Sequence, residues 1–193
     1  KHGVIIGGAA LNRDVENWMK KMKFPYLVGY GMTECGPIIS YCDWRYFEPY
    51  SCGRLVRPLE LRIDSTNAEK VLGEIQVKGD NVMLGYYKNE EATKAAFTKD
   101  GWLRTGDMGT FDKKENVFIK GRCKNMILSP SGQNVYPEEI ESKLSNIPYV
   151  VESLAVGRKN AIIGLIVPNW DAAKADGLSE EALEKLIRDE VKI

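Results

Sequence analysis

The stretch Tyr26-Leu27-Val28-Gly29-Tyr30-Gly31-Met32-Thr33-Glu34-Cys35-Gly36 joins a short apolar run to a glycine-rich loop. The apolar run predicts a buried strand, and the glycines predict that the chain leaves this strand in a loop. Upstream, residues 4–6 form a second apolar run, which enters the segment Gly7-Gly8-Ala9-Ala10. Between the two runs, apolar residues at helical spacing predict a helix over residues 14–22 with its apolar face in the core. This order of strand, helix and strand is typical of an α/β fold.

After about Ser51 the sequence changes to short runs in which apolar and polar residues alternate, separated by glycines. These runs predict a small antiparallel sheet or barrel, interrupted by one helix over residues 90–97. Further on the pattern returns to mixed α/β, with helices expected over residues 137–144 and from Ser179 onwards. We therefore predict a mixed α/β chain in three parts. They are residues 1–50, 51–121 and 122–193, which the family resemblance of the motifs below identifies as the end of a doubly wound α/β subdomain, a small antiparallel β-barrel-like subdomain and a truncated α/β lid domain.

The charge balance limits the classes of partner. Lys and Arg total 27 and Asp and Glu total 27 among 193 residues, so the formal net charge is zero. A chain without a net basic charge is not expected to gather nucleic acid or an anionic membrane by charge alone. No apolar run approaches the roughly 20 residues of a membrane helix, and no amphipathic basic helix supports a peripheral association of the parent protein with a membrane.

The four cysteines form no C-x-x-C pair, and the chain has a single histidine, so no structural zinc site is expected. Their low density does not resemble a small secreted disulfide domain and favours a reduced, cytoplasmic setting. Cys35 and Cys42 lie in or near the glycine loop, but no neighbouring base or cation would make either thiol reactive. Both are predicted to be packing residues.

The loop of residues 29–36 has two readings when it is taken alone. It lacks the spacing of a dinucleotide-binding fingerprint, and Pro37 and Ile38 stand where a P-loop has Lys and Ser or Thr. It fits either a phosphate site, with Thr33 and Glu34 side by side, or a structural turn.

Three later loops have equally open readings. Asp107, which follows Gly106, fits either a ribose-binding carboxylate or a turn residue. Arg122 and Lys124 fit either a hinge or a solvated charge pair. Residues 129–137 are expected to form a long turn before a helix. Taken alone, this segment is most simply interpreted as a connecting loop.

Taken together and in this order, the motifs resemble those of the adenylate-forming enzymes, which include acyl-CoA synthetases, luciferases and peptide-synthetase adenylation domains. The resemblance covers nearly the whole chain, and the runs over residues 85–89 and 134–141 resemble fatty acyl-CoA synthetases most. The matching motifs are Gly7-Gly8-Ala9, Gly29-Tyr30-Gly31-Met32-Thr33-Glu34, Gly73-Glu74-Ile75, Gly85-Tyr86-Tyr87, Gly101-Trp102-Leu103-Arg104-Thr105-Gly106-Asp107, Gly121-Arg122-Cys123-Lys124 and Pro137-Glu138-Glu139-Ile140-Glu141.

The resemblance implies an ATP-dependent ligase that activates a carboxylic acid, expected to be a medium- or long-chain fatty acid, as an acyl-adenylate. The acyl group would then pass to coenzyme A. Thr33 would hydrogen-bond the α-phosphate, Glu34 would hold Mg²⁺, and Asp107 would take the ribose hydroxyls with help from Arg122. The residues implied for ATP or AMP binding are Gly8, Ala9, Gly29, Tyr30, Gly31, Thr33, Asp107 and Arg122.

The same resemblance makes Lys124 a hinge, about which a mobile carboxyl-terminal domain would swing between the two half-reactions. Together with Thr33 and Glu34, Lys124 completes the expected catalytic set. Ser131 and Gly132 would lie near the pantetheine channel and bind coenzyme A. The expected partners are therefore small molecules, and the oligomeric state is left open.

The chain also departs from the family pattern. It lacks the Ser/Thr/Gly-rich phosphate loop with its lysine, and the family's adenylation lysine would lie beyond Ile193. Leu128 stands where several relatives have a lysine. We therefore expect a fragment that does not catalyse adenylation by itself. Two alternatives stay open: an adenylation domain that loads a carrier protein, and a non-catalytic scaffold or binding protein of the same architecture.

Overall fold

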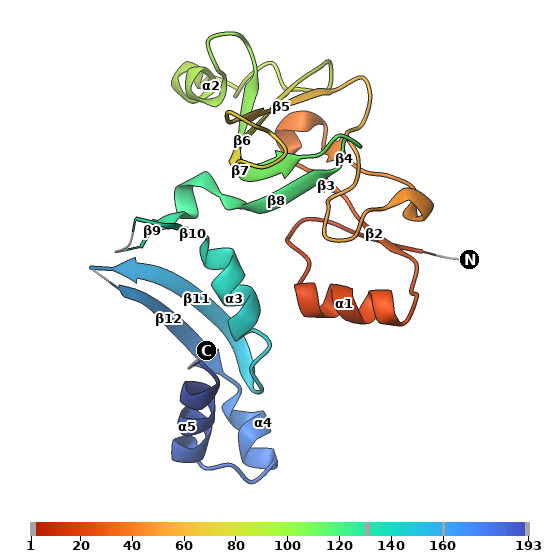
Figure 1. The fold of residues 1–193 in the computed structure, drawn as a ribbon. Coiled ribbons are helices and arrows are strands. Elements are labelled where there is room, and N and C mark those ends of the chain that lie inside the picture. The colour runs from red at the N-terminus through yellow and green to blue at the C-terminus, as the bar shows by residue number, and fades with distance from the viewer. Residues whose placement is uncertain (1–2, 130–131, 160, 192–193) are drawn as a thin grey trace. The chain divides into compact units, whose positions relative to one another are not determined.

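A computed structural model describes residues 3–129, 132–159 and 161–191 (Figure 1). The chain divides into two compact units, Lys1–Lys124 and Asn125–Ile193. Each unit is described by itself below. The division of the chain into three functional parts stays a prediction.

The first unit opens with two parallel strands joined by a helix. β1 and β2 pair in parallel over their whole length, which confirms the predicted strand, helix and strand. The Asn12 side chain caps the helix by accepting hydrogen bonds from the backbone amides of its first turn. These elements are β1 (Val4–Ile6), α1 (Arg13–Lys21) and β2 (Tyr26–Val28).

The apolar face of α1 is exposed in the described part of the chain, so its predicted place in the core is wrong. Trp18 and Met22 are 66% and 62% exposed. The buried residue of this helix is Glu16, whose carboxylate accepts hydrogen bonds from the Tyr26 hydroxyl at 2.8 Å and the Tyr50 amide at 2.7 Å. These two bonds satisfy the carboxylate, which is why Glu16 can be buried.

A short antiparallel pair follows β2 and frames the glycine-rich loop. β3 (Tyr30–Gly31) pairs with β4 (Ile38–Ser40), and the 3₁₀ turn η1 (Thr33–Cys35) lies between them. A second 3₁₀ turn, η2 (Trp44–Tyr46), follows β4.

The rest of the first unit is a four-stranded antiparallel sheet in the order β5-β6-β7-β8. Ile75, Leu103 and Val117, which come from three of these strands, are almost fully buried in its core. Among the described residues β5 does not pair with β8, so the sheet is open, and the barrel-like prediction holds only as far as a small antiparallel sheet. The elements are β5 (Glu60–Asp64), β6 (Gly73–Lys78), α2 (Glu90–Ala96), β7 (Leu103–Phe111) and β8 (Val117–Arg122).

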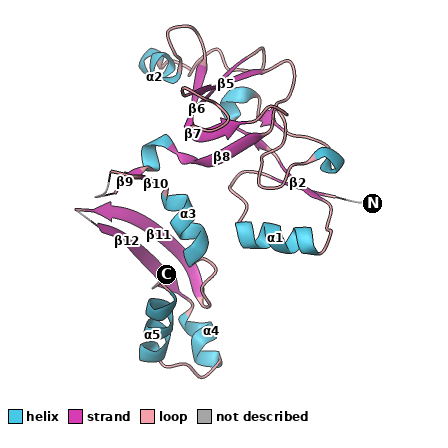
Figure 2. Cartoon of the chain, viewed as in Figure 1, coloured by secondary structure: helices cyan, strands magenta, loops and turns pink. Residues whose placement is uncertain are grey.

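The second unit is built on a long hairpin, β11 and β12, with α3 packed against β11 (Figure 2). Glu141 of α3 accepts a hydrogen bond from the Ala155 amide at 2.9 Å and so ties the helix to the hairpin. Asn169 and Ser179 cap the last two helices. The elements are η3 (Cys123–Asn125), which spans the boundary, β9 (Ile127–Leu128), β10 (Asn134–Val135), α3 (Pro137–Leu144), β11 (Val150–Arg158), β12 (Ala161–Pro168), α4 (Trp170–Ala175) and α5 (Glu180–Glu190).

The predicted mixed α/β class is confirmed, and the helix over residues 137–144 has the bounds that were expected. The short strands β3, β4 and β10 and the helix α4 were not predicted. In the described residues no helix is both long and apolar enough to cross a lipid bilayer.

Candidate functional site

Two glycine-rich loops leave the same edge of the parallel pair β1–β2. Gly7-Gly8-Ala9 follows β1 and Gly29 follows β2, so both loops start at the carboxyl ends of strands, where α/β folds usually bind ligands. The Gly29 amide donates a hydrogen bond to the Ile6 carbonyl at 2.9 Å. A Cβ on Gly7 would lie 3.4 Å from the Gly29 carbonyl oxygen. The two loops therefore start side by side.

The loop after β2 is a tight turn that only glycine can complete at one position. A Cβ on Gly31 would lie 1.9 Å from the carbonyl oxygen of Pro37, a backbone atom that cannot easily move away. Gly36 ends the 3₁₀ turn in the left-handed conformation, with φ of 61°. The Asn81 side chain donates to the Cys35 carbonyl at 2.7 Å and fixes the turn from outside. Thr33, which is exposed, therefore lies on a well-supported backbone.

Asp107 is a buried carboxylate on β7, a central strand of the four-stranded sheet. Its Oδ2 accepts a hydrogen bond from the Tyr30 hydroxyl at 2.6 Å. Its Oδ1 lies 3.2 Å from Nε of Arg122, which faces Asp107 across the β7–β8 ladder. The Asp107 amide donates to Thr105 Oγ1 at 3.1 Å. The Tyr30 hydroxyl and the Arg122 guanidinium thus contact different oxygens of this carboxylate.

Gly106 places Asp107 in this position. Its φ of 74° lies in the left-handed region, although a Cβ there would meet no atom within 4 Å. The reason for glycine at this point is therefore backbone conformation and not space.

Tyr30 links the glycine-rich loop to Asp107. Burial raises the pKa of the Tyr30 hydroxyl far above its ordinary value, and the negative charge of Asp107 raises it further. The hydroxyl therefore stays protonated and donates a hydrogen bond across the neutral pH range. Through this bond the structure brings the candidate residues of β3 and β7 together, and Arg122 joins them.

Glu34, the other candidate carboxylate, is half-buried on the 3₁₀ turn. The Tyr86 hydroxyl donates a hydrogen bond to Glu34 Oε1 at 2.9 Å. This bond raises the pKa of Tyr86, with smaller contributions from burial and from the charge of Glu34. The Met83 amide donates to the Glu34 carbonyl at 2.8 Å, so the segment before α2 supports the turn at two points.

The surroundings of Glu34 fit a magnesium ion that takes most of its ligands from other sources. In the described part of the chain no three His, Cys, Asp or Glu side chains come together as a metal site. Mg²⁺ usually keeps several waters and binds one or two carboxylates together with substrate phosphates. A single carboxylate beside an exposed threonine therefore suits magnesium on a phosphate group better than a resident metal.

The candidate residues of the coenzyme A and hinge motifs lie at and after the boundary of the units. Lys124 is the last residue of the first unit and lies in η3. Gly132 is exposed, with φ of 79° and no atom within 4 Å of its Cβ position. Leu128 is 67% exposed. Ser131 lies outside the described residues.

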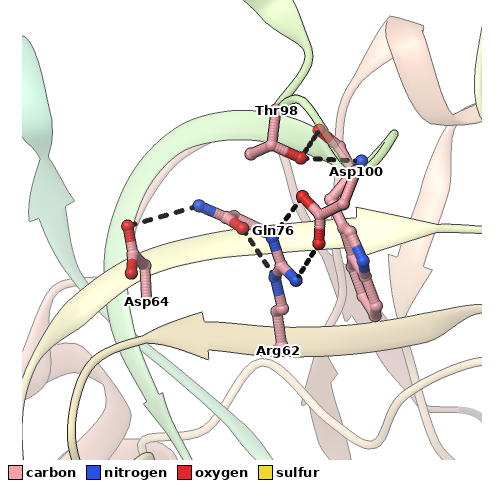
Figure 3. A network of polar contacts seen from close by, with 6 residues as sticks. Arg62, Asp64, Gln76, Thr98 and Asp100 are labelled. Carbon is pink, nitrogen blue, oxygen red and sulfur yellow. Dashed lines mark hydrogen bonds and ion pairs between the residues drawn. The ribbon is translucent and has the colours of Figure 1, made fainter.

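A separate polar network lies on β5 and β6 (Figure 3). Both terminal nitrogens of Arg62 bind the Asp100 carboxylate, at 2.6 and 3.0 Å, and its Nε donates to Gln76 at 2.7 Å. The guanidinium also lies 4.6 Å from the centre of the Trp102 ring. The hydrogen bonds from Arg62 hold the pKa of Asp100 well below its ordinary value. This network ties the turn before β7 to the sheet, and it contains none of the candidate site residues.

The pairing of each candidate carboxylate with a tyrosine was not predicted from the sequence. Tyr30 and Tyr86 both lie in recognised motifs, but no sequence signal connects either of them to a carboxylate far along the chain. Cys35 and Cys42 are buried, as expected of packing residues. Burial raises the pKa of the Cys35 thiol to about 11, which makes it unreactive at neutral pH.

The model of a protein family described as AMP-binding enzyme matches residues 2–87. Among curated proteins, the chain is 37% identical to 4-coumarate–CoA ligase 1 of Oryza sativa subsp. japonica, over 97% of this chain and 36% of that protein. It is 31% identical to a long-chain-fatty-acid–CoA ligase of Rattus norvegicus, over 96% of this chain and 27% of that protein. The chain thus spans about a third of the length of these relatives.

The fold also matches solved structures. The o-succinylbenzoate coenzyme A synthetase of Bacillus subtilis, solved in complex with ATP and magnesium ion, has a TM-score of 0.76 and 27% sequence identity. The match covers 94% of this chain and 41% of that one.

Proposed function

Since the chain belongs to the AMP-binding enzyme superfamily, we propose that it forms part of an acyl-CoA ligase that activates a carboxylic acid with ATP. The acid would attack the α-phosphate, pyrophosphate would leave, and the acyl-adenylate would then react with the thiol of coenzyme A. The relatives extend well beyond the length of this chain, so the activity is proposed for the protein as a whole.

The observation on which this proposal rests is the buried Asp107 carboxylate. Tyr30 and Arg122 are among its partners, and Tyr30 links it to the glycine-rich loop. A carboxylate has two oxygens and about four acceptor positions, so one such group can bind both hydroxyls of a ribose.

The other residues have roles that follow from their places around this carboxylate. Gly8, Ala9, Gly29 and Gly31 would line the nucleotide with backbone alone. The Thr33 hydroxyl would donate to the α-phosphate from the exposed side of its turn. Glu34 would hold magnesium, which supplies positive charge to the phosphate oxygens when it is bound. Tyr86 keeps Glu34 in place.

The second half-reaction assigns roles to residues near the unit boundary. Lys124 would be the hinge, a role supported by its place as the last residue of the first unit. Ser131 and Gly132 would lie along the path of the coenzyme A thiol. If a carrier protein is the acceptor in place of coenzyme A, the same residues of the first unit would still bind the nucleotide.

Two classes of acid are favoured by different relatives. The motifs over residues 85–89 and 134–141 favour a medium- or long-chain fatty acid, as does the ligase of Rattus norvegicus. The higher identity to a 4-coumarate–CoA ligase favours an aromatic acid of that kind as the second candidate. ATP–pyrophosphate exchange by the full-length protein, with fatty acids of graded length and with 4-coumarate, separates the two.

The direct test of the site is Asp107→Ala in the full-length protein. Losing hydrogen bonds to a charged group typically costs about 1.5 to 3 kcal/mol, so ATP affinity should fall roughly ten- to hundredfold. Asp176→Ala is a matched control, because this carboxylate also accepts a hydrogen bond from a tyrosine, Tyr149, but lies in the second unit. Unchanged ATP affinity in a folded Asp107→Ala variant would refute the proposed site.

A further inference from the structure

We propose that the Tyr30 hydroxyl is a positioning group that fixes the Asp107 carboxylate in the orientation in which it binds a ribose. This inference rests on the proposed function and adds a role for one residue of that site. The role belongs to the hydroxyl and is separate from any contact that the tyrosine ring makes with a nucleotide.

Tyr30 and Arg122 differ in how firmly they can orient Asp107. The Arg122 side chain is 64% exposed, and its Nε lies 3.2 Å from Asp107 Oδ1. An exposed ion pair of this kind is screened by water and contributes little to a fixed geometry. The Tyr30 hydroxyl is part-buried and binds Oδ2 at 2.6 Å. Of these two partners, Tyr30 is therefore the one that holds the direction of the carboxylate more firmly.

The backbone on both sides of Asp107 departs from a regular strand. The left-handed Gly106 precedes Asp107, and the β7–β8 ladder changes register between Met108 and Gly109. Such an irregularity changes the direction in which a strand residue points. Tyr30 comes from β3, outside the four-stranded sheet, and so fixes the side chain from a separate element.

The hydroxyl acts as a donor and not as a base. Because burial and Asp107 keep the phenol protonated, its hydrogen bond to Oδ2 is charge-assisted and persists across neutral pH. In this orientation the carboxylate oxygens would accept hydrogen bonds from the 2′- and 3′-hydroxyls of a ribose. Since Thr33 lies three positions after Tyr30, the phosphate and ribose contacts of the nucleotide would be set by one loop.

The test is Tyr30→Phe, which keeps the ring and removes only the hydroxyl. ATP, 2′-deoxy-ATP and 3′-deoxy-ATP are titrated into the full-length protein by calorimetry, and thermal unfolding confirms that each variant is folded. The variant should bind ATP about tenfold more weakly, the order of one hydrogen bond to a charged group. The ribose penalty, by which we mean the loss of affinity from ATP to either deoxy analogue, should shrink at the same time. The misoriented carboxylate would no longer distinguish the analogues from ATP.

Tyr149→Phe is the matched control, since Tyr149 also donates to a carboxylate, Asp176, at 2.9 Å. It should leave both the ATP affinity and the ribose penalty unchanged. A second variant, Arg122→Gln, should weaken ATP binding but keep the ribose penalty within about twofold of the unmodified protein, because the exposed pair contributes little. It tests the inference even if Tyr30→Phe fails to fold.

Three results would overturn the inference while leaving the proposed function in place. They are unchanged ATP binding by Tyr30→Phe, an equal loss of affinity for ATP and both deoxy analogues, and loss of the ribose penalty in Arg122→Gln. If the unmodified protein and Tyr149→Phe bind none of the three nucleotides, the proposed function fails and the inference falls with it.

Discussion

The candidate residues of the two units differ in how the protein supports them. In the first unit, Asp107 and Glu34 each accept a hydrogen bond from a tyrosine, and Asp107 is also buried. In the second unit, the described candidate residue Gly132 is exposed and has open space around it. The first set has its geometry before any ligand is present, which lowers the entropic cost of binding.

This difference indicates which substitutions should affect nucleotide binding and which should affect thioester formation. Changes in the first unit should act on nucleotide binding through fixed contacts. Changes around Gly132 should act on thioester formation through access, because the described residues, its chain neighbours apart, place no atom within 4 Å of that glycine's Cβ position.

The largest expected effect comes from the separate cores of the units. Leu103 is 1% exposed in the first unit, and Leu183 is fully buried in the second. Replacing either with alanine should cost about 2 to 5 kcal/mol of stability in the unit concerned. We expect Leu103→Ala to weaken ATP binding through loss of folded first unit, and Leu183→Ala to leave ATP affinity unchanged.

Denaturant unfolding measures these two changes. In the 193-residue chain, Trp170 is the single tryptophan after residue 124, so replacing Trp18, Trp44 and Trp102 with phenylalanine leaves a fluorescence signal from the second unit alone. In that background Leu183→Ala should lower the midpoint more than Leu103→Ala. An equal shift from both substitutions would show that the units unfold together and would break the comparison.

The next effect concerns two glycines that are needed for different reasons. Gly31→Ala would place its Cβ 1.9 Å from a backbone oxygen, and forced overpacking of this kind costs about 1 to 3 kcal/mol. If this cost falls on the nucleotide site, ATP affinity should fall by about 5- to 150-fold, since 1.4 kcal/mol corresponds to a factor of ten. Gly132→Ala meets no atom and should change ATP affinity by less than about twofold, although its φ of 79° disfavours alanine.

A larger side chain at the second glycine sharpens the contrast. Gly132→Trp should keep ATP–pyrophosphate exchange and lose thioester formation, if the coenzyme A thiol passes this point. Product analysis with coenzyme A measures the second step. Equal loss of both half-reactions would contradict the assignment of Gly132 to the thiol path.

The sequence allowed the elements to be predicted where the chain is locally regular. Apolar runs located β1 and β2, and proline with two acidic residues located the start of α3. The exposed face of α1 could not be predicted, because the burial of Glu16 depends on Tyr26 and on the backbone of Tyr50. Periodicity describes which residues share a face and not which face is covered.

The site was predictable as a set of motifs but not as a set of contacts. Asp107 and Glu34 could be named because each lies in a short motif beside glycine or threonine. Their tyrosine partners come from distant segments, and the choice of Tyr30 and Tyr86 follows from tertiary packing alone.

The smallest effect is chemical and reports on one unit only. All four cysteines lie before residue 125, and burial raises the pKa of Cys35 to about 11 and that of Cys52 to about 12. At pH 8 only about one Cys35 thiol in a thousand is then ionised, so alkylation of the native protein should be slow and should quicken as pH rises toward 11.

Leu103→Ala should speed this labelling by exposing both thiols, whereas Leu183→Ala should not. Mass spectrometry of the labelled peptides measures the rates, and rapid alkylation of Cys35 in the native protein at pH 8 would contradict both its burial and its raised pKa. Because no cysteine lies in the second unit, any acceleration by Leu183→Ala would mean that the second unit stabilises the first.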